Sequence, residues 1–430
     1  MNTGISLYFS NGYEANARVV AKAAKAGVRF AFTSLHIPEE TGVDYRTEAL
    51  RMIALCREAG IALIADVSPV TLQKLGCADF DELHELGIEY VRLDFGFDAR
   101  QTVELSHQFH VVFNASTISE KDIRDWREAG ADFTRFAACH NFYPKRLTGL
   151  ALEDVSRTNA RLKALGFTVM SFVPGDAQLR GPLEEGLPTV EAHRGDRGEA
   201  LFRDMLELFS AQSDVVLVGD PDASDAMWER MRQLAGGCID LAAELEDDFG
   251  YLYGRVQHDR PDSSPWIVRS LESRLWDDVP TPPARRAWEA SGVHARECEA
   301  GDVIVSSRAY GRYAGEVSIA RKPFPLDPRD VVAGRVAKEH VPLLQFVRDG
   351  AGFRLCRESK RLAPPLSPRL PCAAWPLGGP TSNGRASLFC NVCVDWPQRR
   401  REMRFTTLRA WRNGGLTLAQ CQTPIPVVTF

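Results

Sequence analysis

Short apolar runs of strand length recur about every 25 to 30 residues along the first half of the chain, and the segments between them carry apolar residues at helical spacing. Eight runs follow this rhythm. They cover residues 5–9, 29–35, 62–67, 90–95, 110–116, 132–139, 168–173 and 215–219. Eight successive strand–helix units are what a TIM (β/α)8 barrel requires, so the pattern predicts an α/β fold of that kind.

The intervening segments predict amphipathic helices, several of which are followed by a glycine suited to a helix end. The clearest are residues 14–26, 44–59, 119–129, 153–165 and 199–211. A doubly wound open sheet is the structural alternative. It is disfavoured because the first strand–helix turn lacks the Gly-x-Gly-x-x-Gly phosphate loop, and because eight similar units favour closure into a barrel.

The strand–helix rhythm stops around residues 236–238, and the next hundred residues have a different pattern. Short β-type runs, such as residues 302–306 and 315–320, alternate with glycine, proline and charged turns. We therefore expect a barrel domain over residues 1–236 and a mostly β domain over residues 237–356.

A third segment, residues 357–430, is rich in proline and arginine and shows no lasting periodicity. It holds about 11 basic and 3 acidic residues, a net charge of roughly +8 in a chain whose total is −5. This composition predicts an irregular or disordered tail. Cys390 and Cys393 have the spacing of half a zinc site, but Cys372 and Cys421 stand alone, so we expect no metal there.

Charge and cysteine usage limit the function classes. A formal net charge of −5 argues against a nucleic-acid binder, so a small polar ligand is favoured. The first residues enter a strand pattern directly, which predicts no secretory signal, and no apolar run reaches membrane-spanning length. Cys56 and Cys139 lie where small buried side chains belong, as in reduced proteins, so we expect a cytoplasmic protein.

Polar side chains gather where the predicted strands end. In a TIM barrel the carboxyl ends of the strands converge on one face, and the loops there build the active site. The strand-end residues are Asp66, Arg92, Asp94, Asn114, the run from Cys139 to Pro144, and the loop segment from Pro188 to Arg194. Five such strand ends in succession indicate a functional site on this face.

Each member of this set also has a purely structural explanation. His140, Asn141 and Tyr143 before Pro144 could form a capped turn. Asp66 could cap a helix, Asp94 could pair with Arg92, and the segment from Glu191 to Arg194 could be a solvated loop. The number of polar strand ends, rather than any single residue, favours the functional explanation.

The same segments resemble the signature blocks of the bacterial 6-phospho-N-acetylmuramidases, glycoside hydrolase family 170. The blocks are Gly4 to Tyr8, Asp66 to Pro69, Arg92 to Phe97, Cys139 to Pro144 with Thr148 to Leu150, Pro188 to Arg194, Val268 to Ser270, Gly311 to Glu316 and Pro325 to Arg329. The resemblance covers residues 1 to about 356 and implies a TIM barrel followed by a cyclophilin-like β domain. One loop position that is often acidic in the family is Ala192 here.

The resemblance implies a cytoplasmic hydrolase of peptidoglycan recycling that cleaves the disaccharide of 6-phospho-N-acetylmuramic acid and N-acetylglucosamine, with no cofactor and no metal. Such cleavage needs two carboxyl groups, and Asp66 with Asp94 is the first candidate pair. Neighbouring strands would place these carboxyl groups near the roughly 5 to 5.5 Å of a retaining enzyme. Glu191 could instead be the acid, and the substrate's own acetamido group could be the nucleophile; all three routes stay open.

A phosphate and a carboxylate on the substrate call for basic and amide side chains. The candidates for substrate binding are Tyr8, Arg92, Asn114, His140, Asn141, Tyr143, His193, Arg194 and, from the β domain, Arg269. The alternatives are another phosphosugar-processing barrel enzyme (a glycosidase, lyase or isomerase) and a non-catalytic sugar-phosphate-binding protein. We expect no nucleic-acid or membrane partner.

Overall fold

Eight parallel strands form a closed barrel in this computed structural model, which describes residues 1–34, 45–67, 69–93, 96–282 and 297–357. The strands follow chain order around the barrel, and β1 closes the ring by pairing with β8. They are β1 Asn2–Ser6, β2 Phe30–Ser34, β3 Ala62–Val67, β4 Tyr90–Leu93, β5 His110–Asn114, β6 Phe136–Cys139, β7 Thr168–Val173 and β8 Val215–Val218. The predicted fold of this half of the chain is confirmed.

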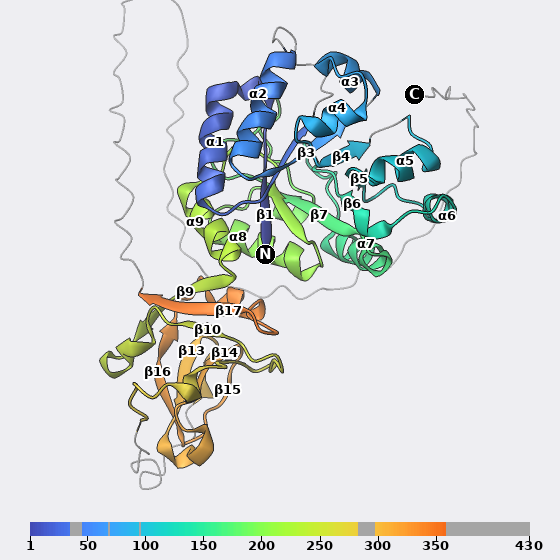
Figure 1. The fold of residues 1–430 in the computed structure, drawn as a ribbon. Helices are drawn as coiled ribbons and strands as arrows, with labels where there is room; N and C mark the ends of the chain where they lie inside the picture. Colours follow the sequence, from blue (N-terminus) through green and yellow to red (C-terminus); the bar gives the residue numbers. More distant parts are fainter. Residues whose placement is uncertain (35–44, 68, 94–95, 283–296, 358–430) are drawn as a thin grey trace, which may run out of the picture. The chain divides into compact units, whose positions relative to one another are not determined.

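Helices surround the barrel on its outside (Figure 1). They are α1 Tyr13–Lys25, α2 Tyr45–Glu58, α3 Pro69–Leu75, α4 Phe80–Glu85, α5 Ala99–Ser106, α6 Glu120–Glu128, α7 Leu152–Leu165, α8 Glu199–Ser210 and α9 Asp225–Ala235. Capping boxes begin two of them: the side chain of Asp98 accepts from the amide of Gln101, and that of Ser119 accepts from the amide of Asp122.

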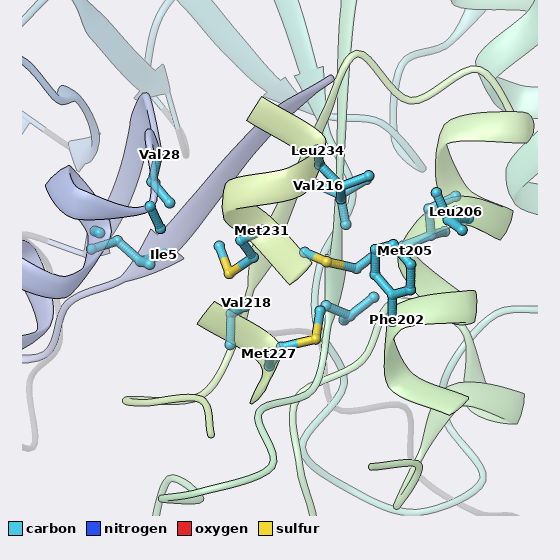
Figure 2. Packing of buried hydrophobic residues seen from close by; sticks show 14 of the residues in the cluster. Ile5, Val28, Phe202, Met205, Leu206, Val216, Val218, Met227, Met231 and Leu234 are labelled. Carbon is cyan, nitrogen blue, oxygen red and sulfur yellow. The ribbon is translucent and has the colours of Figure 1, made fainter. Parts of the chain in front are cut away.

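The sheet buries apolar side chains on both of its faces, as expected for a parallel barrel. Figure 2 shows the outer layer, where Met205 of α8 and Met227 and Met231 of α9 pack beside Val216 and Val218 of β8. Alternate residues of the strands point inward and fill the interior. The inner cluster comprises Phe32, Ile64, Val112, Ala137, Cys139, Met170, Phe172, Val215 and Leu217. The barrel is thus a packed core rather than a pore.

Two strands differ from their predicted bounds by three residues or more, for local reasons. The first begins and ends three residues earlier than expected, because Phe9 belongs to the 3-10 turn η1 Phe9–Asn11. The sixth begins at Phe136 rather than Asp132. Here the side chain of Asp132 accepts from the amide of Thr134 at 2.9 Å and starts the 3-10 turn η2 Phe133–Arg135.

A mostly β region follows the barrel. Seven strands form one nearly closed sheet in the order β10-β17-β9-β16-β13-β14-β11, and β12 pairs with β15. The strands are β9 Cys238–Leu245, β10 Val256–His258, β11 Ile267–Arg269, β12 Glu297–Cys298, β13 Asp302–Ser306, β14 Val317–Ala320, β15 Phe324–Pro325, β16 Asp330–Val336 and β17 Gly352–Arg357. The predicted β character is confirmed, while the exact limits of the two domains stay a prediction.

Short 3-10 turns complete the described residues. Besides η1 and η2 they are η3 Glu191–His193, η4 Asp247–Leu252, η5 Ser273–Leu275, η6 Arg308–Tyr313 and η7 Val341–Gln345. No helix in the described part of the chain is both long and apolar enough to cross a bilayer. Cys56 and Cys139 are buried free thiols, as predicted. The predicted irregular tail, with Cys390 and Cys393, lies outside the described residues.

Candidate active site

Three of the predicted site residues meet at the carboxyl ends of β3, β4 and β6. Arg92 lies between the other two: its Nη1 is 3.5 Å from Oδ2 of Asp66, and its Nη2 donates to Oδ1 of Asn141 at 2.6 Å. Ser34 at the end of β2 adds a hydroxyl that donates to Oδ2 of Asp66 at 3.3 Å. The expected convergence of strand ends therefore produces an ion pair extended by an amide, with all members partly exposed.

A cavity of about 580 Å³ opens beside this network, between the ends of β4 and β5 and the first turns of α5 and α6. Its volume is in the range of small-molecule sites. Predicted site residues on its wall are Arg92, Asn114 and Asn141, and they are joined by Phe97, Lys121 and Trp126. The wall thus combines amides and aromatic faces, which suit a sugar, with two cations and with the carboxyl groups of Asp98, Asp122 and Asp125, the last of which pairs with Lys121.

Asp94 lies outside the described residues, so its distance from Asp66 stays a prediction. Tyr143 is half-buried, and its amide donates to the carbonyl of Pro188 at 2.9 Å. Thr189, next to Pro188, connects the same two loops through its hydroxyl, which donates to the carbonyl of Asn141 at 3.0 Å. The loop after β7 therefore holds the backbone of the predicted sugar-binding run.

The carboxylate of Glu191, in the loop after β7, is hydrogen-bonded to the loop after β6. Its Oε1 accepts from the amide of Leu147, its Oε2 accepts from the amide of Gly149, both at 2.8 Å, and both oxygens accept from Arg194 at 2.7 Å. These donors, chiefly the Arg194 guanidinium, lower the pKa of Glu191 to about 2. At neutral pH this carboxylate holds no proton to transfer.

Close approach of these loops explains a glycine in the Thr148-Gly149-Leu150 block. A Cβ on Gly149 would lie 2.8 Å from the backbone nitrogen of Glu191, so a side chain would push the loops apart. Leu147, one of the residues bonded by Glu191, has a φ of 64°, a left-handed conformation that costs free energy for leucine. The carboxylate of Glu191 stabilises that conformation through the Leu147 amide.

The N–H groups of the Arg194 guanidinium donate hydrogen bonds to other groups of the protein. Besides Glu191, Arg194 donates to the carbonyls of Glu185, Gly186, Tyr143 and Lys145, and only 8% of its side chain is exposed. A guanidinium offers five N–H donors, so little remains for a substrate phosphate.

His140 faces the helix layer. It is 1% exposed, and its Nε2 lies 2.7 Å from Oδ1 of Asn159 on α7. Asn159, also buried, donates in turn to the carbonyl of Ala211. Burial lowers the pKa of His140, which keeps the imidazole neutral at pH 7. Sequence reasoning overlooked Asn159, because an asparagine in a helical pattern carries no signal for its partner.

Tyr8 is buried too, and its hydroxyl donates to the carbonyl of Gly219 at 2.5 Å. The Arg180 guanidinium lies over its ring, 4.1 Å from the centroid. Burial raises the pKa of the Tyr8 phenol well above its usual value. The Tyr8 ring, which follows β1, therefore holds the Arg180 guanidinium by a cation–π contact.

Asp220, which follows β8, organises the loop after β7. Its carboxylate accepts from the amides of Gly175 at 2.8 Å, Arg180 at 2.9 Å and Leu187 at 2.9 Å. Only 1% of Asp220 is exposed, and this burial raises its pKa. Its position directly after a strand was the available signal. The partners, up to 45 residues away in the chain, were not visible in the sequence.

The remaining two predicted residues have partners away from the network around Arg92. His193 is 1% exposed and its Nε2 lies 3.2 Å from Oε2 of Glu207 on α8. Arg269 lies on β11, where its guanidinium pairs with Glu316 at 3.3 Å and with Asp262 at 3.9 Å.

Comparison with known sequences decides the family. Residues 3–233 match the family described as "6-phospho-N-acetylmuramidase, N-terminal", and residues 239–356 match "6-phospho-N-acetylmuramidase, C-terminal". The chain belongs to the 6-phospho-N-acetylmuramidase family. It is therefore a glycosidase, and the family name implies a substrate containing phosphorylated muramic acid. No curated protein matches the chain.

Solved structures share the fold over most of the chain. A conserved protein of unknown function from Enterococcus faecalis is 27% identical, with a TM-score of 0.63 over 84% of this chain and 97% of that one. An uncharacterized B. cereus protein is 25% identical, with a TM-score of 0.62 over 83% of this chain and 99% of that one. These likenesses support the architecture of a 6-phospho-N-acetylmuramidase but add no description of activity.

Replacing Glu191 by Gln should destabilise the paired loops by about 1–3 kcal/mol at pH 7, because the amide cannot accept from all four donors. The pKa of Glu191 falls from an ordinary 4.5 to about 2 on folding. Its contribution is thus complete above about pH 4.5 and is lost as the pH falls toward 2. Thermal unfolding of both proteins between pH 7 and 3 measures this, and the difference should shrink on acidification.

Glu184→Gln is the matched control, because Glu184 is an exposed acid on the same loop. It should unfold like the parent protein at every pH. Equal stability of the Glu191→Gln variant and the parent at pH 7 would contradict the role of Glu191.

Proposed function

We propose that this 6-phospho-N-acetylmuramidase hydrolyses the disaccharide of 6-phospho-N-acetylmuramic acid and N-acetylglucosamine, at the carboxyl ends of the barrel strands. Family membership supports the reaction class. The observation that carries the location is the Asp66–Arg92–Asn141 network, which borders a cavity of about 580 Å³. The proposed setting is peptidoglycan recycling in the cytoplasm.

Asp66 and Asp94 are the proposed catalytic carboxyl groups. The ion pair with Arg92 suits Asp66 to the role that needs a negative charge, either as nucleophile or as the group that orients the substrate's acetamido oxygen for attack. Glu191 is disfavoured as the acid, because the hydrogen bonds from Arg194 lower its pKa to about 2. Asp94 then becomes the candidate acid that protonates the leaving oxygen, a role that rests on its sequence position alone.

Arg92, Asn114, Asn141 and Tyr143 are the proposed contacts to the sugar and its charged groups, because they are partly exposed around the cavity and the adjoining loop. Lys121 joins them from α6. Tyr8, His140, His193, Arg194 and Glu191 are proposed as positioning residues, because each is bonded to backbone or helix partners within the protein. Arg269 is proposed to stabilise the β domain through Glu316.

Incubating the purified full chain with the phosphorylated disaccharide tests the proposal directly. Free N-acetylglucosamine should appear in step with 6-phospho-N-acetylmuramic acid, and the unphosphorylated disaccharide should react at least about 10²-fold more slowly, because ion pairs to the phosphate are lost. No release between pH 5 and 9 would refute it. A panel of other phosphorylated glycosides in the same assay identifies a related glycosidase activity, should that be the better substrate class.

A further inference from the structure

Behind the loop after β7, one histidine and two acids converge at the surface of α8. His193 ends η3, while Asp204 and Glu207 lie one turn apart on α8 and so share a helix face. One potential ligand atom from each of the three lies within 4.8 Å of the other two. We propose that His193, Asp204 and Glu207 bind a divalent transition metal ion, with Zn²⁺ as the first candidate.

Hydrogen bonding in this cluster is incomplete in a way that points to a missing partner. Asp204 is 1% exposed, and its Oδ2 has no hydrogen-bond partner among the described residues. The nearest cation, Arg203, lies 3.6 Å from the other oxygen, beyond hydrogen-bonding distance. Buried carboxylate oxygens are almost always paired or bound to metal, because leaving one unpaired costs free energy.

The local charge also favours a divalent cation. Three carboxylates, Asp196, Asp204 and Glu207, surround the single Arg203 guanidinium at 3.4 to 3.6 Å. With Asp204 ionised and the imidazole neutral, the cluster would carry a net charge of about −2, which one divalent ion would cancel. In the metal-free protein burial raises the pKa of Asp204 to about 8, so the ion would bind by displacing the proton of this carboxyl group.

The donor set selects the kind of metal. An imidazole nitrogen with two carboxylate oxygens suits Zn²⁺ better than Ca²⁺ or Mg²⁺, which prefer oxygen ligands. Around Zn²⁺, ligand atoms at about 2.1 Å from the metal lie roughly 3.4 Å from one another. The three atoms, now within 4.8 Å, would need only small side-chain rotations to reach this arrangement.

Bound metal would tie η3 to α8. Glu191, two residues before His193, begins the same turn and holds the loop after β6. The ion would therefore be a positioning element for the site's loops, and its binding does not depend on which glycoside is cleaved.

Titration of the chelator-treated full chain with ZnCl2 at pH 7.5, followed by calorimetry and by thermal unfolding, tests this. All proteins carry Cys390→Ser and Cys393→Ser, so that the thiol pair of the tail cannot contribute. One equivalent should bind, and saturation should raise the unfolding midpoint by roughly 2 to 8 °C. Asp204→Asn should abolish both effects while remaining about as stable as the parent in chelator, because burial raises the pKa of Asp204 to about 8 and the amide then replaces a carboxyl group that is largely uncharged without the metal.

Two further variants sharpen the result. Arg203→Gln removes the competing cation and should tighten Zn²⁺ binding by about 10-fold. His258→Gln is the matched control: His258 also pairs with a carboxylate, Glu272 at 2.6 Å, but belongs to no three-residue cluster in the described part of the chain. It should bind Zn²⁺ like the parent. No bound Zn²⁺, or binding unchanged by Asp204→Asn, would overturn the proposal and favour a carboxyl group that keeps its proton.

Discussion

Asp94→Asn should lower kcat/KM for the phosphorylated disaccharide by about 10³-fold, within the range expected for losing a general acid. The amide cannot protonate the leaving N-acetylglucosamine oxygen. Asp66→Asn should cost at least as much, because it removes the negative charge needed beside the anomeric carbon. Steady-state kinetics on both variants measures these losses.

An activated substrate separates the two roles. A 4-nitrophenyl glycoside of 6-phospho-N-acetylmuramic acid leaves without protonation, so Asp94→Asn should cleave it within about 10-fold of the parent rate. Asp66→Asn should stay slow with both substrates. Unfolding midpoints should match the parent protein. A collapse of the fold in either variant would instead assign that aspartate a structural role.

Asp220→Ala should cost about 3–5 kcal/mol of stability and most of the activity, because two buried N–H groups and one partly buried N–H group would lose their shared acceptor. The amides of Gly175, Arg180 and Leu187 all bond this carboxylate, and they span the loop after β7. Thermal unfolding measures the first effect. Limited proteolysis should show new cleavage within residues 174–190.

Asp225→Ala is a suitable control. Asp225 lies in the first turn of α9, so its removal should cost only a few tenths of a kcal/mol. Asp220→Asn should fall between the two, since an amide oxygen can still accept part of the bonding. A fully stable Asp220→Ala variant would show that other contacts fix the loop.

Hydrophobic patterning predicted the barrel because strand and helix periods alternate regularly through eight units. The bounds of β3 and β7 match their prediction, since polar or proline residues end both apolar runs. Four helices of the described residues were not identified: α3, α4 and α5 are only 7, 6 and 8 residues long, and α9 was missed as well. Propensity over so few residues is a weak signal.

The convergence of the polar strand ends was predictable from the sequence, but the direction of each side chain was not. Strand order placed Asp66, Arg92 and Asn141 on one face, and the structure joins them by direct contacts. For His140 and His193 the sequence could not show which way the side chains point. Both contact helices, through Asn159 and Glu207, and such partners 14 to 19 residues away are set by tertiary packing.

The hydrogen bonds between the loops after β6 and β7 also limit how this enzyme can be re-engineered. The side chains of Glu191 and Arg194 bond to backbone groups within residues 143–149, and Leu150 forms a parallel bridge with Val190. A chimera that exchanges the loop after β6 alone would leave a partly buried carboxylate and guanidinium facing foreign backbone. Residues 140–150 and 174–198 should therefore be exchanged together when these loops are transferred into another barrel.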